Sequence, residues 1–330
     1  MSLRTSDFDY ELPGHLIALQ PAPQRDQARM LVIHRQTGVL QHRLVSDFPE
    51  YLHEGDLTVL NDTRVMPARV FSDDGRIELL LLEQESPAVW RSLVRPGRRM
   101  RTGHTVLVDG IRGVVEEVYA DGDRKIRFDS VLDLERIGKL PLPPYIERQL
   151  QNDDWDRYQT VYARESGSVA APTAGLHFTP ELLGRIRHAF LTLHVGVGTF
   201  RPVQTENPEE HPMHSERFRL PDSTAEAIRA AKRVIAVGTT TVRVLESVAA
   251  AAGVSAREIR ETEGRTNLFI RPPFEFRVVG GLLTNFHLPK STLLMLVSAL
   301  AGRELVLEAY REAVREEYRF YSYGDCMLVV

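Results

Sequence analysis

Cysteine is nearly absent from this chain: Cys326 is the one thiol among 330 residues. A single cysteine excludes an internal disulfide framework and a thiolate zinc site within the chain, and it fits a protein that works in a reducing compartment. Because its neighbours in the sequence are apolar, we expect Cys326 to fill a small space in the core and not to act as a nucleophile.

Long hydrophobic runs are also missing. The longest one, residues 292–302, is too short to cross a bilayer, and it predicts a buried helix after Ser291. Residues 1–9 lack the apolar core of a signal peptide. We therefore expect a cytoplasmic protein that does not enter a membrane.

Neither sign of charge dominates the composition. The 41 Lys and Arg residues nearly balance the 45 Asp and Glu residues, and the formal net charge is -4. Any polyanion would therefore have to be held by a local basic patch. One such patch is present, in a run of four arginines. Runs of this kind are most often solvated surface charge, and the alternative is that the patch binds nucleic acid. Its members are Arg95, Arg98, Arg99 and Arg101.

Standard catalytic motifs are absent as well: the sequence has no Walker loop, no His-Glu-x-x-His and no Gly-x-Ser-x-Gly. Gly196-Val-Gly198 is half of a dinucleotide fingerprint, and a glycine turn after a strand explains it better. His211 and His214 have a spacing seen in metal sites, but Pro212 argues against a helix that presents both. A polar loop that uses His214 and Glu216 for hydrogen bonding or proton transfer is the stronger interpretation.

Three stretches of the chain share one design, in which an apolar run is followed by a corner rich in glycine, threonine or serine. They are residues 191–200, 234–243 and 282–292, and a related polar corner follows the apolar residues 56–60. Such corners present backbone N–H groups and hydroxyls at the ends of strands. In an α/β sheet they meet at the carboxyl ends of neighbouring strands, so the pattern predicts a polar ligand site and favours an enzyme.

The stretch from Gly167 to Thr179 is dominated by small residues, which let the backbone approach a ligand closely. Thr173 and His177 add a hydroxyl and an imidazole, and the segment predicts a ligand-binding loop. The alternative is a tight structural loop that leads into a helix, because Thr179 and Pro180 are typical of an N-cap and a first helical residue.

The segment from about Ser72 to Pro144 has the pattern of an antiparallel β domain. Short apolar or alternating runs are separated by turn signals, of which Asp109-Gly110 and Asp121-Gly122 suit hairpins. Evenly spaced short strands predict a small barrel or sandwich. The proline cluster 141–144 closes the segment as a plausible hinge.

The rest of the chain has an α/β pattern. Residues 30–34 and 56–60 predict strands, residues 223–226 match a capping box, and helices are expected near 241–252, ended by Gly253, and near 304–318. Residues 319–330 predict a terminal strand. We predict an α/β (α+β) main domain built from both chain ends, residues 1–69 and 149–330, with an inserted small antiparallel β-barrel domain at residues 70–148.

Long motifs recur along the whole chain. They are DFDYELP at 7–13, LNDTRVMPAR at 60–69, YQTVYA at 158–163, residues 167–179, TLHVGVGTFRPV at 192–203, MHSE at 213–216, AVGTT at 236–240, residues 284–298 and YRFYSYGD at 318–325. In this order they make the chain resemble the S-adenosylmethionine:tRNA ribosyltransferase-isomerases of queuosine biosynthesis. The chain looks shorter than the family pattern after Phe71, after Ile186 and around 261–266, at expected loop tips where deletions are tolerated.

The resemblance implies an activity. These enzymes transfer the ribosyl group of S-adenosylmethionine to 7-aminomethyl-7-deazaguanine at the tRNA wobble position, giving epoxyqueuosine, adenine and methionine. The sulfonium acidifies the C5′ protons, and a base removes one of them. Elimination then opens the ribose, the exocyclic amine attacks, and epoxide closure expels methionine. S-adenosylmethionine is thus a consumed substrate, and we expect no metal and no further cofactor.

The resemblance also implies which side chains act. The corners and the loop at 172–177 would form the S-adenosylmethionine pocket. The candidates for proton transfer are His177, His194, His214, Glu216 and His287. For His194, which lies in an alternating stretch, a satisfied core histidine is the alternative.

Substrate binding is expected from polar and small residues at the corners. Arg64 and Arg243 could clamp a carboxylate or phosphate, with Asp62 orienting Arg64. A surface ion pair between Arg243 and Glu246 is the alternative for that arginine. The full set is Asp62, Arg64, Thr173, Gly175, Gly196, Gly198, Thr199, Gly238, Thr239, Thr240, Arg243, Asn285, Lys290 and Ser291, of which Thr239, Thr240, Lys290 and Ser291 fit binding at helix N-termini.

The resemblance implies a monomer that binds tRNA, and it makes the arginine run at 95–101 the expected tRNA contact. Two other functions stay open. An RNA methyltransferase would release S-adenosylhomocysteine in place of adenine and methionine, and a non-catalytic RNA-binding protein would leave S-adenosylmethionine intact.

Overall fold

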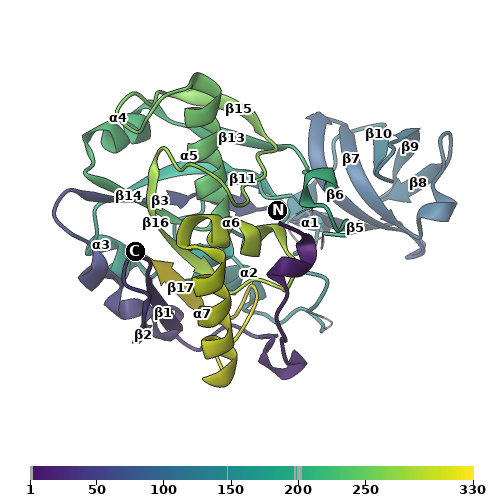
Figure 1. Cartoon of the computed structure of the whole chain (residues 1–330). Helices are drawn as coiled ribbons and strands as arrows, with labels where there is room; N and C mark the ends of the chain where they lie inside the picture. Colours follow the sequence, from purple (N-terminus) through teal and green to yellow (C-terminus); the bar gives the residue numbers. More distant parts are fainter. Residues whose placement is uncertain (1–2, 147, 197, 199–202) are drawn as a thin grey trace.

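The computed structural model describes residues 3–146, 148–196, 198 and 203–330. In this part of the chain the strands form a nine-stranded sheet, a six-stranded sheet and a two-stranded pair. Figure 1 shows the six-stranded sheet, which we call the barrel, beside a larger main body that contains both chain ends. Within the described ranges, none of the helices has the length and apolar character needed to cross a membrane.

The main body is built on the nine-stranded sheet. Its central neighbours β12, β3, β14 and β16 are parallel, whereas β13, β15 and β2 are antiparallel additions at its edges and β17 runs antiparallel to β16. In sheet order the strands are β15 (Thr262–Thr266), β13 (Glu216–Leu220), β12 (His188–Leu193), β3 (Asp56–Asn61), β14 (Arg233–Val237), β16 (Val279–Asn285), β17 (Cys326–Val329), β1 (Arg29–His34) and β2 (Val39–Leu44). The separate pair is β4 (Thr63–Val65) with β11 (Glu165–Ser168).

Both faces of this sheet are covered. In β1, Leu31 and Ile33 belong to one hydrophobic core, and the alternate residues Met30 and Val32 belong to another. Successive side chains of a strand point to opposite faces, so a continuous apolar run requires a layer on each side. Cys326 lies in β17, fully buried in the second core, as expected.

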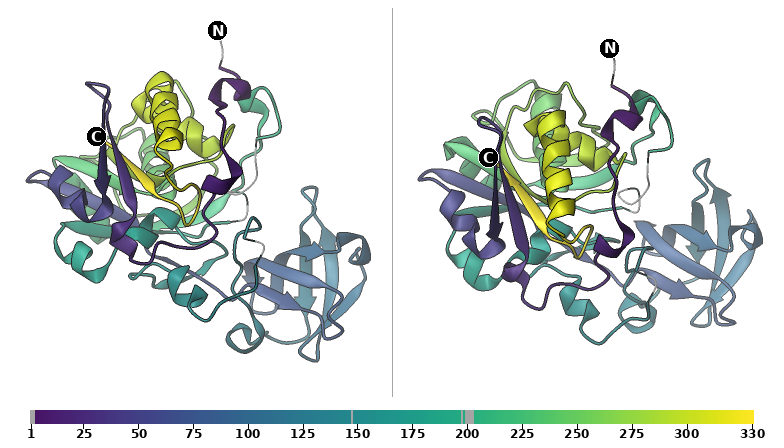
Figure 2. Two further views of the ribbon diagram at one scale, coloured as in Figure 1. Left: turned by 90° about the horizontal axis from the view of Figure 1, so that it is seen from below. Right: turned by 60° about the horizontal axis from the view of Figure 1, so that its bottom comes forward.

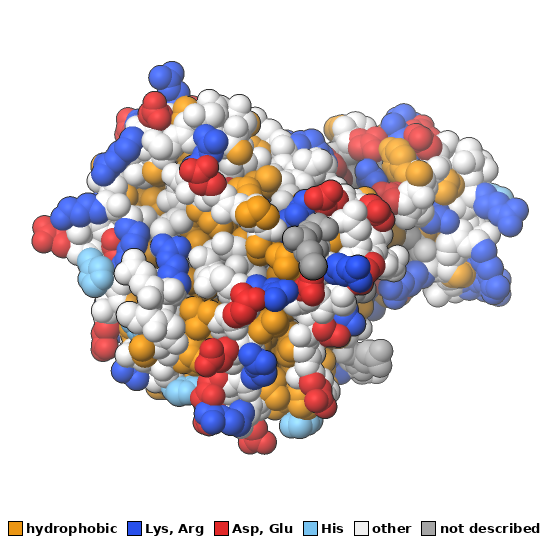
Figure 3. Space-filling model, viewed as in Figure 1, with side chains coloured by type: hydrophobic (Ala, Val, Ile, Leu, Met, Phe, Trp, Pro, Cys, Tyr) orange, Lys and Arg blue, Asp and Glu red, His pale blue; other side chains and the backbone are white. Residues whose placement is uncertain are grey.

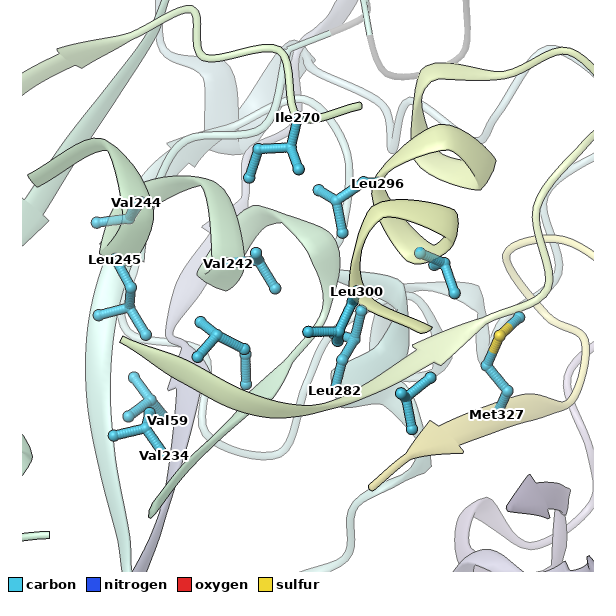
Figure 4. Packing of buried hydrophobic residues seen from close by; sticks show 14 of the residues in the cluster. Val59, Val234, Val242, Val244, Leu245, Ile270, Leu282, Leu296, Leu300 and Met327 are labelled. Carbon is cyan, nitrogen blue, oxygen red and sulfur yellow. The ribbon is translucent and has the colours of Figure 1, made fainter. Parts of the chain in front are cut away.

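Helices supply the two layers. One face is covered by α4 (Asp222–Ala230), α5 (Thr239–Ala252), α6 (Thr292–Ala301) and α7 (Arg303–Arg315), and the other by α3 (Pro180–Gly184) and the 3₁₀ helices η4 (Val45–Tyr51) and η6 (Thr173–His177). Figure 4 shows Val242 of α5 and Leu296 and Leu300 of α6 packed near Leu282 of β16. In both views of Figure 2, α6 and α7 lie together on one side of the sheet. Two short helices, α1 (Leu134–Ile137) and α2 (Asp154–Arg157), come after the barrel strands in the sequence.

The barrel confirms the antiparallel β fold predicted for this part of the chain. Its strands are β5 (Arg69–Phe71), β6 (Glu78–Ser86), β7 (Val89–Arg95), β8 (Thr105–Val108), β9 (Ile111–Val118) and β10 (Arg124–Phe128), in the order β5-β6-β7-β10-β9-β8. Asp73 N–H donates to the Leu107 carbonyl at 2.9 Å and so connects the two ends of the sheet. Asp109 and Gly110, with φ of 54° and 75°, form the predicted turn between β8 and β9.

Three helix ends agree with the sequence. Thr179 accepts from Leu182 N–H at 3.1 Å and caps α3, and Ser291 accepts from Leu294 N–H at 3.2 Å and caps α6. Gly253 ends α5 with a φ of 68°, a left-handed conformation that glycine adopts without strain.

Three other boundaries were wrong. Helix α4 begins at Asp222 without a side-chain cap, so residues 223–226 are its first turn and not a capping box. Helix α7 ends at Arg315, because Glu317 has a φ of 54° that no helix continues. The terminal strand begins only at Cys326, since Asp325 accepts the N–H groups of Arg29 and Arg319 and holds the preceding residues in a loop.

All six strands of the barrel lie between Arg69 and Phe128, and every strand of the nine-stranded sheet lies outside that range. The domain boundaries at residues 69/70 and 148/149 themselves stay a prediction.

Candidate active site at the carboxyl edge of the sheet

The carboxyl ends of the parallel strands β12, β3, β14 and β16 lie side by side at one edge of the sheet. Asn61, the last residue of β3, joins this edge: its Nδ2 donates to the Leu193 carbonyl at 2.9 Å, and its Oδ1 accepts from Leu193 N–H at 3.0 Å. Gly238 N–H, just past β14, donates to the Leu283 carbonyl of β16 at 2.8 Å. The described parts of the corners predicted from the sequence therefore lie together.

Three adjoining cavities open at this edge. The large cleft has a volume of about 1230 Å³ and lies between Trp90 of the barrel and His194 of the main body. The Arg243 pocket, of about 30 Å³, shares His214 and Glu216 with the large cleft. The α5 pocket, of about 60 Å³, is lined by the first residues of α5 and shares Val195 with the large cleft.

Arg243 of α5 and Glu216 at the start of β13 form a buried ion pair at the Arg243 pocket. Arg243 Nη1 donates to Glu216 Oε2, and Arg243 Nε donates to the Leu268 carbonyl at 3.1 Å. The other carboxylate oxygen of Glu216 accepts from Gly196 N–H at 2.9 Å and holds that corner in place. Within the described part of the chain, Arg243 Nη2 is buried without a partner, which leaves one cationic donor for a ligand in this pocket.

The alternative of a surface ion pair between Arg243 and Glu246 was wrong. Glu246 is fully buried, and its carboxylate accepts from the N–H groups of Arg277, Val278 and Val279 at 2.8, 3.1 and 2.8 Å. Burial raises the pKa of Glu246, although these hydrogen bonds oppose the shift. Arg243 and Glu246 are both buried, and each is satisfied by a different group: Arg243 by Glu216, and Glu246 by backbone N–H groups.

His194 and His214 both line the large cleft. His194 is half-buried, and its Nδ1 lies 2.9 Å from Thr63 Oγ1. Burial and the nearby Arg217 lower the pKa of His194, so the imidazole is neutral and able to accept a proton. Because His194 both lines the cleft and contacts Thr63, proton transfer and the alternative of a satisfied histidine both stay predictions.

Two glycines make room for these imidazoles. A Cβ on Gly167 would lie 2.8 Å from His194 Cε1, and a Cβ on Gly198 would lie 2.3 Å from His214 Cδ2. Any other residue at these two positions would force the imidazole beside it to move, so the two glycines allow the histidine rings to lie where they do.

His177 and His287 are fully buried. Burial lowers the pKa of His177 to about 4, helped by Arg25 and Arg319, and lowers the pKa of His287 to about 3. His287 lines the α5 pocket with its Nε2 3.1 Å from Thr284 Oγ1, and His177 lies behind that wall with its Nε2 3.4 Å from Asn285 Nδ2. Both are neutral near pH 7, which favours hydrogen bonding over acid catalysis.

Several of the predicted substrate-binding residues line the α5 pocket. They are Thr173, Gly238, Thr239, Thr240 and Asn285. Gly175 lies nearby in η6 outside the lining of the three cavities, and a Cβ there would lie 2.1 Å from Tyr162 Oη. This glycine permits close packing and does not face a ligand.

Asp62 and Arg64 do not cooperate as expected. Asp62 is buried, accepts from Thr192 Oγ1 at 2.7 Å and pairs with Arg164 at 2.8 Å. Arg64 is exposed on β4 outside the lining of the three cavities. Successive residues of a strand point to opposite sides, so Asp62 and Arg64, two positions apart, would share a face only if the strand were regular. The chain leaves β3 at Asn61 and starts β4 at Thr63, which separates them.

Lys290 and Ser291 also lie outside these cavities. Lys290 Nζ pairs with Asp9 at 2.8 Å, and Ser291 is the N-cap of α6. The Ser291 side chain thus caps the start of α6, whereas α5 follows Gly238 and has no side-chain cap. Thr199, the remaining predicted contact at the 191–200 corner, lies outside the described residues.

The arginine run lies on the barrel, next to the turn that carries Asp121 and Asp123 of the large cleft. Arg124 donates from Nη2 to the Gly97 carbonyl at 3.0 Å and from Nη1 to the Gly122 carbonyl, and so connects the two segments. Arg95 ends β7, Arg98 and Arg99 lie in the 3₁₀ helix η5 (Gly97–Arg99), and Arg101 follows, all exposed. Trp90 lines the cleft five residues earlier on the same strand, a separation of about 17 Å. In Figure 3 the outer end of the barrel carries Lys and Arg side chains, and the main body shows both signs interspersed.

Sequence reasoning missed two parts of the site. Arg265 of β15 donates from Nη1 and Nη2 to the two carboxylate oxygens of Glu83 in β6, at 2.6 and 3.2 Å, and so connects the main body to the barrel across the large cleft. No local pattern signals a pair so distant in sequence. Tyr321 and Ser322 line the α5 pocket, and their place in the motif at 318–325 was the available signal.

His211 and His214 are the two histidines whose spacing is seen in metal sites. Across the described ranges, no group of three or more His, Cys, Asp or Glu side chains is arranged to hold a metal ion. His211 lines the large cleft beside His214, and burial together with that neighbour lowers its pKa.

Known proteins resemble this chain over nearly its whole length. The profile of the family described as "Queuosine biosynthesis protein" matches residues 5–329. The S-adenosylmethionine:tRNA ribosyltransferase-isomerases of Desulfitobacterium hafniense and Symbiobacterium thermophilum are each 50% identical to it, with 99% of this chain and 100% of the relative covered. The first alignment runs over 349 positions against 330 residues here, so that relative contains residues that this chain lacks.

A solved structure agrees with the sequence comparison. The crystal structure of S-adenosylmethionine tRNA ribosyltransferase from Thermotoga maritima matches with a TM-score of 0.56 and 38% identity, covering 98% of this chain and 100% of that one. The family profile over residues 5–329, the matching fold and the full-length identity near one half lead to one conclusion. The chain belongs to the queuosine biosynthesis protein family.

Proposed function

We propose that this protein is an S-adenosylmethionine:tRNA ribosyltransferase-isomerase that forms epoxyqueuosine in tRNA. One observation carries the proposal: four strand ends meet at three adjoining cavities, so a small polar ligand and a much larger partner can be held at the same edge. The names of relatives that match over their full length support it.

In the proposed reaction, a base removes a C5′ proton that the sulfonium of S-adenosylmethionine acidifies. Elimination from the resulting ylide breaks the bond between C4′ and the ring oxygen and so opens the ribose. Adenine then leaves and takes up a proton. The exocyclic amine of 7-aminomethyl-7-deazaguanine attacks the unsaturated sugar, and epoxide closure expels methionine with its methyl group still on sulfur. Because the sulfonium supplies the activation, the reaction needs no metal or other cofactor.

Among the five candidates for proton transfer, position favours His194 and His214. Both line the large cleft, whereas His287 faces the small α5 pocket, His177 lies behind the wall of that pocket, and Glu216 is committed to Arg243 and to Gly196 N–H. A neutral half-buried imidazole is a suitable base near pH 7. We assign Arg243 and Glu216 to positioning, because they hold the Gly196 corner that forms one wall of the cleft.

The large cleft has the size expected of a site that admits a tRNA anticodon base as well as a nucleoside. The exposed arginine run would then hold the tRNA backbone at a distance from the reacting atoms. We expect that alanine at Arg98, Arg99 and Arg101 weakens tRNA binding and lowers the salt dependence of binding by about one unit of slope per arginine. Alanine at Arg311 and Arg315, exposed on α7, serves as the control.

Binding titrations of tRNA at several salt concentrations test this assignment, and an unchanged slope in the triple variant would move the tRNA contact elsewhere. The protein would act as a monomer in the cytoplasm, where its tRNA substrate is modified.

The activity is tested by incubating the protein with S-adenosylmethionine labelled in the ribose and with tRNA that carries the deazaguanine precursor. Mass analysis of the digested nucleosides should show the labelled epoxycyclopentanediol on the modified base. A methylated nucleoside would support the RNA methyltransferase alternative, and an unchanged nucleoside with intact S-adenosylmethionine would support a non-catalytic RNA-binding protein.

A further inference from the structure

The α5 pocket contains a buried acceptor without a partner. Asn285, the last residue of β16, is 3% exposed and lines the pocket, and its Oδ1 has no hydrogen-bond partner among the described residues. A buried amide oxygen without a donor is costly, and such atoms in folded proteins usually meet a ligand or water.

The orientation of this amide is set by its other end. Asn285 Nδ2 donates to the Tyr321 carbonyl at 3.1 Å and lies 3.4 Å from His177 Nε2. The carbonyl of Tyr321 can only accept, so the nitrogen must be the atom that faces it. The oxygen is therefore the atom left for a donor in the pocket.

The same pocket contains an uncapped helix start. Gly238 precedes α5 with a φ of 84°, and it has no side chain with which to cap the N–H groups of Thr239 and Thr240. These N–H groups have no acceptor within the helix, and a helix of 14 residues concentrates partial positive charge at this end. Thr239 and Thr240 both line the pocket. The N-terminus of α5 can therefore bind an anionic group, and Asn285 Oδ1 beside it can accept a hydrogen bond from a cationic or neutral donor.

Charge and size narrow the ligand group. Among the described residues that line the pocket, none is Asp, Glu, Lys or Arg, and burial keeps His287 neutral by lowering its pKa to about 3. A net-neutral group is therefore favoured over an isolated ion. The volume of about 60 Å³ exceeds the roughly 10–15 Å³ that a cavity needs to hold one water, and it suits a group of a few heavy atoms.

We propose that the α5 pocket binds the α-amino-acid head group of the substrate, with the carboxylate at the N-terminus of α5 and the ammonium at Asn285 Oδ1. This inference rests on the proposed function, because it assigns one end of S-adenosylmethionine. Val195 lines both the α5 pocket and the large cleft, so the nucleoside end extends from the pocket into the cleft. The head group of the methionine product occupies the same place.

The test compares ligands on the wild-type protein by isothermal titration calorimetry. Decarboxylated S-adenosylmethionine lacks the carboxylate, a deaminated analogue lacks the ammonium, and 5′-methylthioadenosine lacks the whole head group. Each analogue should bind about tenfold or more weakly than S-adenosylmethionine, because each loses a charge-assisted hydrogen bond. Equal affinity for S-adenosylmethionine and the deaminated analogue would overturn the assignment, and this comparison requires no variant.

Asn285→Ala supplies the second comparison, with Asn152→Ala, at an exposed asparagine, as the matched control. Asn285→Ala should weaken binding of S-adenosylmethionine about tenfold and leave the affinity for the deaminated analogue unchanged. An equal loss for both ligands would overturn the contact with the ammonium. If the wild-type protein forms epoxyqueuosine while these ligand comparisons fail, the pocket assignment alone is wrong. If the wild-type protein neither binds nor consumes S-adenosylmethionine in the presence of tRNA that carries the deazaguanine precursor, the proposed function itself is wrong.

Discussion

Arg243 and Glu216 form an ion pair in which the side chains are 7% and 6% exposed, at the junction of the Arg243 pocket and the large cleft. Removing one partner leaves the other charge buried without compensation. We expect Glu216→Ala to lower the free energy of unfolding by about 3–5 kcal/mol, measured by urea denaturation.

The control is Arg219→Ala, which removes an exposed pair with Glu263 and should change stability by less than about 1 kcal/mol. Combining Glu216→Leu with Arg243→Met should recover much of the loss, because no charge is then stranded. A change within about 1 kcal/mol for Glu216→Ala would mean that the pair is hydrated and not buried.

Gly198 allows the His214 ring to lie where it does. Gly198→Ala puts a Cβ 2.3 Å from His214 Cδ2, so the ring must move by a large part of an ångström. Displacements of that size reduce turnover about 10- to 100-fold when the displaced group transfers a proton. The measurement is kcat/KM for epoxyqueuosine formation. Gly184→Ala, where no atom lies within 4 Å of the added Cβ, is the control. Wild-type turnover in Gly198→Ala would exclude His214 from the reaction.

The buried His177 makes stability depend on pH. Its pKa is lowered to about 4 in the folded protein from about 6.5, so between these values the unfolded chain binds more protons. Stability is therefore full above about pH 6.5 and falls as the pH drops toward 4.

From about pH 7.5 to about pH 5.5, the free energy of unfolding should fall about 1 kcal/mol more in the wild type than in His177→Asn. His15→Asn, at an exposed histidine, should keep the wild-type slope. Parallel pH profiles for the wild type and His177→Asn would show that His177 is hydrated.

Arg265 and Glu83 bridge the main body and the barrel. Their side chains are 44% and 31% exposed, so Arg265→Ala should change the free energy of unfolding by less than about 1 kcal/mol. The pair nevertheless crosses the large cleft, and its loss should widen the range of separations between the two parts.

Spin labels on cysteines introduced at the exposed positions Leu107 and Arg311 report that range, and buried Cys326 stays unlabelled. Arg219→Ala is the control on the neighbouring strand. Identical distance distributions for Arg265→Ala and Arg219→Ala would show that the ion pair does not restrain the cleft.

Local patterns predicted much of the fold. Strands with alternating or continuous apolar residues, the Asp109-Gly110 turn, the Thr179 cap, the helix after Ser291 and the Gly253 helix end depend on neighbours in sequence, and the structure has all of them. The capping box at 223–226 was wrong because the same residues fit a first helical turn equally well. The end of α7 depends on a left-handed residue, Glu317, that no sequence rule marks.

The site was less predictable, because its polar partners are far apart in sequence. The corner residues Gly238 and Thr239 could be placed from a strand followed by a helix. The partner of Arg243 could not: Glu246 is three residues away on the same helix, but Glu216 is brought beside Arg243 only when β13 joins the sheet. For the same reason Asp62 was assigned to Arg64 and in the structure pairs with Arg164.

The most direct measurement follows the methyl group of S-adenosylmethionine. The protein is incubated with S-adenosylmethionine that carries a labelled methyl group and with tRNA bearing the deazaguanine precursor, and label is counted in tRNA and in free methionine. Our account predicts that all label released from S-adenosylmethionine is in methionine, with one adenine released for each methionine. Label in the tRNA together with S-adenosylhomocysteine would contradict it.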